Sequence, residues 1–158
     1  MNKKLSNLLR IMIVGMALCG IVIYLFAFPY IGKSLVGMYP EFENRFWPWL
    51  IFLWMTGIPC YIVLVQIWKV TDTIKKDKVF VSENVKRISL ISKLALFDST
   101  FFLLGNIVLL FLSMNHPSIV ILSLGISFIG YSISIVSYAF ANFVNKAVVL
   151  QEESDLTI

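Results

Sequence analysis

Four long apolar segments constrain this chain more than any other feature of its sequence. They lie at about residues 11–28, 46–68, 94–114 and 118–144. A helix needs about 20 mostly apolar residues to cross the hydrocarbon core of a bilayer, and these segments approach or exceed that length. Because lipid offers no hydrogen-bond partner to a peptide group, each segment is predicted to be a helix. The predicted fold of residues 1–158 is therefore all-α, a single integral membrane four-helix bundle.

The composition agrees with a chain that resides mostly in a membrane. Hydrophobic residues make up 59% of the chain and charged residues only 14%. Soluble domains contain about 25% charged residues, so an ordinary soluble fold and a disordered chain are both disfavoured. The predicted location is a cell membrane that the chain crosses several times, with the lipid bilayer as its first partner.

The basic residues predict which ends of the helices face the cytoplasm. Eleven lysines and arginines fall in three segments that share one side of the membrane: residues 1–10, a loop at 69–93 and a tail at 145–158. The loop at 29–45, which starts at the predicted helix end at Pro29, holds only Lys33 and Arg45. Cytoplasmic segments carry such an excess of positive charge, so both termini are predicted to be cytoplasmic. The opposite interface is marked by a belt of aromatic residues: Tyr30, Tyr39, Phe42, Phe46, Trp47 and Trp49.

Three polar residues inside the predicted spans need a partner or a function. Asp98 is the costliest, because a carboxylate in the bilayer costs about 2.5–3.5 kcal/mol at mid-depth on insertion scales. Asn142 precedes Lys146 by one helical turn, and it is predicted to lie at the depth of Asp98 and to pair with it. Such a contact is favoured over a proton or ion relay, since a lone carboxylate makes a poor relay. Asn106 is predicted to form a hydrogen bond between helices.

The last apolar segment carries a regular series of small side chains. They are Ser123, Ser127, Gly130, Ser134, Ser137 and Ala141, at gaps of 4, 3, 4, 3 and 4 residues. This spacing places them on one face of a helix and lets another helix approach closely. The lining of a polar channel is the alternative. Close helix packing is favoured, because serines in a membrane helix can also bond to backbone carbonyls.

The loop at 69–93 and the tail at 145–158 form the predicted partner-binding surface. Its residues are Lys75, Lys76, Lys78, Phe80, Glu83, Asn84, Lys86 and Arg87 in the loop, and Glu152, Glu153, Asp155, Leu156 and Ile158 in the tail. Ser82 is predicted to cap a helix that leads into the third span, and the acidic tail could dock on the basic loop. Contact of the loop with anionic lipid is the alternative, and direct binding of nucleic acid is disfavoured.

No motif for catalysis or metal binding stands out. Glu41, Glu43 and His116 could together hold a metal ion on the outer side, but nothing in the sequence enforces the geometry. No nucleophile–base pair can be assembled, so the chain is predicted to be no enzyme and to need no cofactor. Cys19 and Cys60 lie in apolar segments and are predicted to be buried thiols.

Two stretches of the sequence, together with the four-span layout, carry a family resemblance. The stretches are Phe80-x-x-Glu83-Asn84-Val85-Lys86-Arg87-Ile88 and Glu152-Glu153-Ser154-Asp155-Leu156-Thr157-Ile158. With these features the chain resembles the bacterial domain-of-unknown-function 2975 family, whose tails often have asparagine where Ser154 stands. Members are small integral membrane proteins, many of them encoded beside a small helix-turn-helix regulator. The resemblance implies a bacterial membrane partner of such a regulator, and it implies no catalytic residues.

Two functions follow as hypotheses. The first is a membrane-bound sensor or sequestering partner of a small helix-turn-helix transcription regulator, with the loop and the tail as its signalling surface. The alternative is a bacteriocin-immunity or small-solute membrane protein that acts through the helices or the outer loop. A membrane enzyme is the weakest hypothesis. The sequence specifies neither the signal nor the oligomeric state, and it is compatible with a homo-oligomer.

Overall fold

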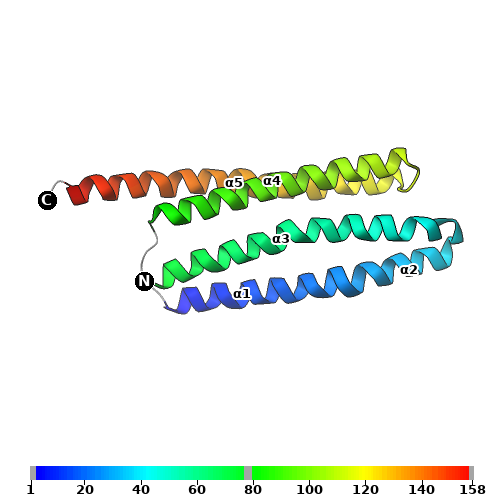
Figure 1. Cartoon of the computed structure of the whole chain (residues 1–158), viewed down its shortest axis with the longest axis horizontal. Coiled ribbons are helices and arrows are strands. Elements are labelled where there is room, and N and C mark those ends of the chain that lie inside the picture. Colours follow the sequence, from blue (N-terminus) through cyan, green and yellow to red (C-terminus); the bar gives the residue numbers. More distant parts are fainter. Residues whose placement is uncertain (1–2, 77–79, 157–158) are drawn as a thin grey trace.

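The structure is built of long antiparallel helices. The computed structural model describes residues 3–76 and 80–156. The elements are α1 (Lys3–Val22), the π-helical turn η1 (Ile23–Ala27), α2 (Phe28–Met38), the 3₁₀ helix η2 (Pro40–Arg45), α3 (Phe46–Lys75), α4 (Ser82–Phe111) and α5 (Pro117–Leu156). Within the described residues, four helical rods are long and apolar enough to cross a membrane, at Lys4–Met38, Pro40–Lys75, Ser82–Phe111 and Pro117–Ser154. The prediction of an all-α chain with four long apolar helices is confirmed (Figure 1).

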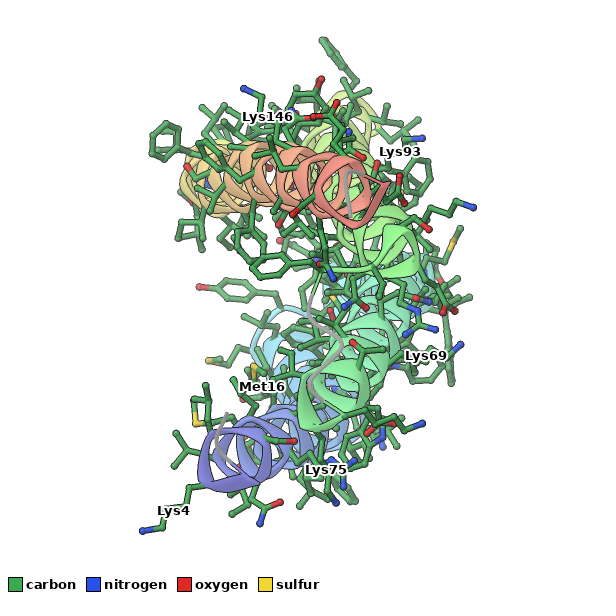
Figure 2. All side chains as sticks on the ribbon, turned by 90° about the vertical axis from the view of Figure 1, so that its left-hand side faces the viewer. Lys4, Met16, Lys69, Lys75, Lys93 and Lys146 are labelled. Carbon is green, nitrogen blue, oxygen red and sulfur yellow. The ribbon has the colours of Figure 1, made fainter. Side chains whose placement is uncertain are left out.

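The helices are longer than a bilayer core is thick. At about 1.5 Å per residue, the 30 residues of α4 and the 40 residues of α5 extend over about 45 and 60 Å, against about 30 Å of hydrocarbon. Both ends of the chain lie at one end of the molecule, and the last turns of α5 continue past the start of α4 (Figure 1). We call this the basic end, since Lys4, Lys69, Lys75, Lys93 and Lys146 surround it (Figure 2). The opposite end, which holds η2, is the aromatic end.

The four helical rods form an open row, an arrangement that the sequence did not specify. Each helix packs on its neighbour in the row: α1 on α3, α3 on α4, and α4 on α5. Within the described residues, α1 makes no close backbone approach to α4 or α5. Seen from the basic end, the row passes from α1 at the bottom through α3 to α4 and α5 at the top (Figure 2). Lipid is as apolar as the helix surfaces, so only faces that match in shape or in hydrogen bonds pack together.

The first span continues through Pro29, where the sequence predicted its end. The turn before this proline is π-helical, and the Phe28 N–H donates to the Ile23 carbonyl five residues earlier. The Tyr24 carbonyl then has no helical donor, because the next residue in that pattern is Pro29, which lacks an N–H. The Trp54 indole N–H of α3 donates to this carbonyl at 2.8 Å. A side chain of the neighbouring helix therefore lets the rod continue into α2.

The connections at the aromatic end are compact. The prediction of a loop at 29–45 is wrong, because most of this segment is helical. Only Tyr39 lies between α2 and η2. The last two helices are joined by a short turn at 112–116, where Ser113 has a positive φ of 55°.

The connection at the basic end is shorter than predicted on its α3 side. The second span was predicted to end at about residue 68, but α3 continues to Lys75, and α4 then starts at Ser82. A helix does start at this serine, but the prediction that its side chain caps the helix is wrong. Val81 holds the capping position, and its carbonyl accepts the Asn84 N–H at 3.0 Å.

The small-residue face of α5 packs on α4, as predicted. Ser123, Ser127, Ser134 and Ala141 are buried, and Gly130 and Ser137 are partly buried. The Ser127 hydroxyl donates to the Ser99 carbonyl at 3.2 Å. Ser92 and Ser134 each donate to the carbonyl of the other, at 2.9 and 2.8 Å. These bonds need two backbones close together, which small side chains permit, and they fix the register of α4 against α5.

Candidate functional site

The ends of α3, α4 and α5 pack into a small folded unit at the basic end. Its buried residues are Ile88 of α4 and Ala141, Val144 and Val148 of α5, with the partly buried Val70 and Val85 packed against them. Where water surrounds such a unit, burying an aliphatic side chain contributes about 1.5–3 kcal/mol. This core therefore holds the projecting ends of three helices in fixed positions.

Most residues of the predicted partner-binding surface are exposed around this core. We call the exposed set the juxtamembrane platform: Lys75, Lys76, Phe80, Glu83, Lys86, Glu152 and Glu153. Arg87 is partly buried and donates to Glu83, one turn earlier on α4. The tail is helical through Leu156, so it continues α5 as a rod. Lys78, Ile158 and the side chains of Asp155 and Leu156 lie outside the described residues.

Asn84 does not belong to this exposed surface, contrary to the prediction. Only 1% of its surface is exposed. Its Oδ1 accepts a hydrogen bond from the Thr73 hydroxyl of α3 at 2.9 Å. Asn84 therefore ties the start of α4 to the end of α3, and its role there is structural.

An ion pair between α1 and α3 at the basic end was not predicted. Arg10 pairs with Asp72, and its guanidinium carbon lies 5.1 Å from the centre of the Trp68 ring. Nearby, the buried Ser6 hydroxyl donates to the Thr71 carbonyl at 3.5 Å. The signal for the pair was present in the sequence. Two antiparallel helices joined at the aromatic end place residues about equally far from the joint at the same level, and Arg10 and Asp72 are such residues.

Asp98 faces α3 and makes a contact that the sequence analysis missed. Its Oδ2 accepts a hydrogen bond from the Cys60 thiol at 3.5 Å, and its Oδ1 has no hydrogen-bond partner among the described residues. One turn earlier on α3, the Thr56 and Tyr24 hydroxyl oxygens lie 3.4 Å apart. These polar side chains form a ladder across three helical rods. The ladder holds a single carboxylate, so a structural contact stays favoured over a relay. Cys19 and Cys60 are exposed on the helix surfaces, and the prediction of buried thiols is wrong.

The predicted pair of Asp98 and Asn142 is wrong. Asn142 is exposed. The antiparallel register fixed by Ser92 and Ser134 places Asn142 level with Asn84, about 20 Å along the helix axis from Asp98 at about 1.5 Å per residue. The prediction failed because α5 continues far beyond a bilayer core, so a nearby lysine did not mark the membrane interface.

Asn106 is buried, but its hydrogen bonds do not join two helices as predicted. Its amide nitrogen donates to the Phe102 carbonyl of the same helix at 2.9 Å. Its Oδ1 accepts from the side-chain amide of Asn115, in the turn between α4 and α5, at 2.8 Å. Asn106 therefore holds the α4–α5 turn, because it lies closer to the end of α4 than its position in the apolar segment suggested.

The aromatic end holds a pocket of about 650 Å³. It lies between α2, η2 and the start of α3 on one side and the α4–α5 turn on the other. Glu41 and His116 line it, and Glu43 does not. In the part of the chain that the structure describes, no group of three histidine, cysteine or acidic side chains is placed to hold a metal ion.

Comparison with known proteins decides the family. The profile described as "Protein of unknown function (DUF2975)" matches residues 30–158. This chain is a member of that family. It is similar to the uncharacterized membrane protein YoaS of Bacillus subtilis (strain 168), with 24% identity over 160 residues that cover all of both chains. No solved structure matches it. The four apolar helices and this relative agree that the DUF2975 chain is a multi-pass membrane protein.

Proposed function

We propose that this membrane protein is a sensor or sequestering partner of a small soluble helix-turn-helix regulator, which docks on the juxtamembrane platform. The observation that carries the proposal is the packed core at the basic end, formed by Ile88, Ala141, Val144 and Val148. The core turns the ends of three helices into a fixed protein surface outside the spans, and such a surface suits recognition of a folded partner. The class of the partner comes from the family resemblance.

The acidic part of the juxtamembrane platform suits a DNA-binding partner. Glu152 and Glu153 are exposed near the end of α5. The DNA-contacting face of a small regulator is basic, so binding to these carboxylates would compete with binding to DNA phosphates. Exposed ion pairs contribute only about 0–1 kcal/mol each, so charge alone gives weak docking. Phe80, 50% exposed at the α3–α4 connection, adds apolar area to the same surface.

The proposal requires the basic end to face the cytoplasm, as the excess of lysine and arginine supports. Single cysteines in place of Lys33 and Lys76, in a chain without Cys19 and Cys60, test this orientation with a membrane-impermeant maleimide. We expect labelling of Lys33→Cys in intact cells and of Lys76→Cys only after permeabilisation. Equal labelling of both from outside contradicts the orientation.

Docking is tested by co-sedimentation of a small helix-turn-helix regulator, of the kind encoded beside many genes of this family, with membranes that contain the protein. Changing Glu152 and Glu153 to lysine turns two attractive charges into repulsive ones, so about tenfold less regulator is expected to sediment. Glu41→Lys with Glu43→Lys is the matched control, because it makes the same charge change at the aromatic end. Deletion of residues 152–158 should also abolish docking and leave membrane insertion unchanged. Normal co-sedimentation with both altered tails would rule out docking on the platform.

The pocket at the aromatic end favours a second candidate, a small-solute or bacteriocin-immunity protein. Under this hypothesis a deletion strain becomes more sensitive to a membrane-active peptide, and the tail variants restore resistance as well as the unaltered chain does. Restoration that depends on Glu152 and Glu153 argues for the platform instead.

A further inference from the structure

The pocket at the aromatic end combines apolar walls with two opposite charges. We propose that it binds the headgroup of a zwitterionic phospholipid of the phosphatidylethanolamine class, with the phosphate on Arg45 and the ammonium on Glu41. The pocket lies at the other end of the molecule from the juxtamembrane platform, so the proposal does not depend on regulator docking.

The size and the walls of the pocket fit a headgroup and the adjoining parts of its acyl chains. Its volume of about 650 Å³ lies within the usual range of ligand pockets, about 300–1,000 Å³. The apolar part of its lining includes Leu35, Val36, Phe46, Trp49, Leu110 and Ile119. Gly32 keeps this wall in place, since a Cβ there would stand 2.6 Å from the Phe46 ring. A larger residue at position 32 would push that ring out of its position in the pocket wall.

The pocket exists because the row of helices is open at this end. Within the described residues, α2 and η2 make no close backbone approach to α4 or α5. The Asn115 side-chain amide donates to Asn106 Oδ1 at 2.8 Å, and this hydrogen bond holds the α4–α5 turn against the end of α4. The apolar lining reaches the surface at Ile119, which is 36% exposed. Acyl chains can therefore leave the pocket along α5 and stay in the surrounding lipid.

The two charges that line the pocket are available to a ligand. The Arg45 guanidinium carbon lies 5.2 Å from the centre of the Phe42 ring. Among the described residues, neither Arg45 nor Glu41 forms an ion pair. A guanidinium held over a ring keeps its N–H edge free, and that edge matches two oxygens of a phosphate.

The opposite charges also specify the kind of headgroup. A phosphate on Arg45 and an ammonium on Glu41 satisfy both side chains, which lie four residues apart in the 3₁₀ helix η2 and both line the pocket. Phosphatidylglycerol offers the phosphate and leaves Glu41 without a cation. The aromatic residues around the pocket are of the kind that gathers at headgroup level in membrane proteins, so the site lies where this ligand is concentrated.

Native mass spectrometry of the purified full-length protein in detergent, titrated with dioleoyl phosphatidylethanolamine or dioleoyl phosphatidylglycerol, tests the proposal. We expect the ethanolamine lipid to bind about tenfold more tightly than the glycerol lipid, since it adds one charge-assisted contact. Arg45→Gln should weaken both lipids by about tenfold. Glu41→Gln should weaken the ethanolamine lipid alone and bring the two affinities together.

Matched controls are available at the same end of the molecule. Lys33→Gln and Glu43→Gln remove the same charges from exposed residues that do not line the pocket, and both should bind lipid like the unaltered protein. Equal affinity of the unaltered protein for the two lipids, or equal losses in the pocket and control variants, overturns the proposal. Glycerophosphoethanolamine, which has no acyl chains, should fail to displace the lipid at equal concentration. Displacement there would assign the pocket to a soluble phosphate zwitterion and overturn the lipid assignment.

Discussion

The α4–α5 pair and the α1–α3 pair are antiparallel helix pairs in one membrane protein, and opposite kinds of side chain hold them together. Between α4 and α5, small residues bring the backbones close enough for the Ser127 and Ser134 hydroxyls to bond to backbone carbonyls of α4. Gly130 lies within the same contact, because a Cβ there would overlap the Ser99 hydroxyl and stand 3.1 Å from Ser99 Cβ.

Between α1 and α3, tyrosine side chains occupy the space beside glycines, which have no side chain of their own. A Cβ on Gly20 would stand 2.7 Å from the Tyr61 hydroxyl, which donates to the Ala17 carbonyl at 2.9 Å. The reverse contact places the Tyr24 ring of the first rod 3.2 Å from a Cβ built on Gly57 of α3. Each of the two rods, the first at Lys4–Met38 and the second at Pro40–Lys75, thus supplies both a tyrosine and a glycine.

The difference shows two ways to join helices where the hydrophobic effect gives no driving force. Both pairs have hydrogen bonds to a backbone carbonyl across the interface. At the close contact of Gly130 these bonds come from short serine side chains, whereas at Gly20 the bond comes from the long side chain of Tyr61. A larger side chain between α4 and α5 must separate two backbones, whereas a larger side chain between α1 and α3 displaces only the flexible end of a tyrosine side chain. We therefore expect a larger side chain to destabilise the protein more in the α4–α5 interface than in the α1–α3 interface.

The largest effect is expected from Gly130→Leu. The added side chain would separate α4 from α5 and break the nearby Ser127–Ser99 hydrogen bond, so we expect a loss of about 3 kcal/mol of stability, at the upper end for overpacking. Unfolding by SDS titration in mixed micelles measures it. Gly125→Leu is the matched control on the same helix, since a Cβ on Gly125 has no neighbour within 4 Å. Equal losses in the two variants would contradict a close contact at Gly130.

A smaller effect is expected from the corresponding change between α1 and α3. Gly20→Leu displaces the Tyr61 hydroxyl and costs its hydrogen bond to Ala17, so we expect a loss of about 1 kcal/mol. Gly15→Leu is the control, because a Cβ on Gly15 also has no neighbour within 4 Å. If Gly20→Leu destabilises the protein as much as Gly130→Leu, the proposed difference in tolerance is wrong.

Much of the α4–α5 interface could be predicted from sequence, because small residues repeat at helical spacing in one continuous segment. The repeat at Ser127, Gly130 and Ser134 is a local signal, and both its face and its purpose were predicted correctly. The α1–α3 interface gave no such signal. Its tyrosines pair with glycines about 30 to 40 residues away in the chain, so only the fold shows which aromatic residue meets which glycine.

The candidate site was predicted only in part for the same reason. The exposed charges of the juxtamembrane platform follow from local composition, and most of them are where the sequence placed them. The burial of Asn84 and the direction of Asp98 depend on the register between helices. That register is set by contacts such as Ser92–Ser134, which the hydropathy of single segments does not reveal. The level of Asn142 was predicted wrongly for a similar reason, because the hydropathy of the segment did not show how far α5 continues.

The single substitutions Ser92→Ala and Ser134→Ala test the reciprocal hydrogen bonds of the α4–α5 pair. Each hydroxyl donates to the other residue's backbone carbonyl, and hydrogen bonds between membrane helices contribute about 0.6 kcal/mol on average. Because each substitution removes one hydroxyl and leaves both carbonyls in place, we expect each to cost about that much stability. Unchanged stability in both variants would contradict these hydrogen bonds.

The smallest effect is expected at the ion pair that joins α1 to α3 at the basic end. The side chains of Arg10 and Asp72 are 28% and 40% exposed, so solvent and salt screen them and the pair should contribute about 0.5 kcal/mol. Arg10→Gln also removes the contact with Trp68, so the loss of stability in this single variant overstates the contribution of the ion pair. The cycle of Arg10→Gln and Asp72→Asn removes that contribution, because both arms of the cycle contain it. Raising the salt concentration should abolish this coupling and leave the losses from Ser92→Ala and Ser134→Ala unchanged, since only the first depends on exposed charges. An Arg10–Asp72 coupling that persists in high salt would mean that the pair is shielded from solvent, and that both helix pairs are held by interior contacts.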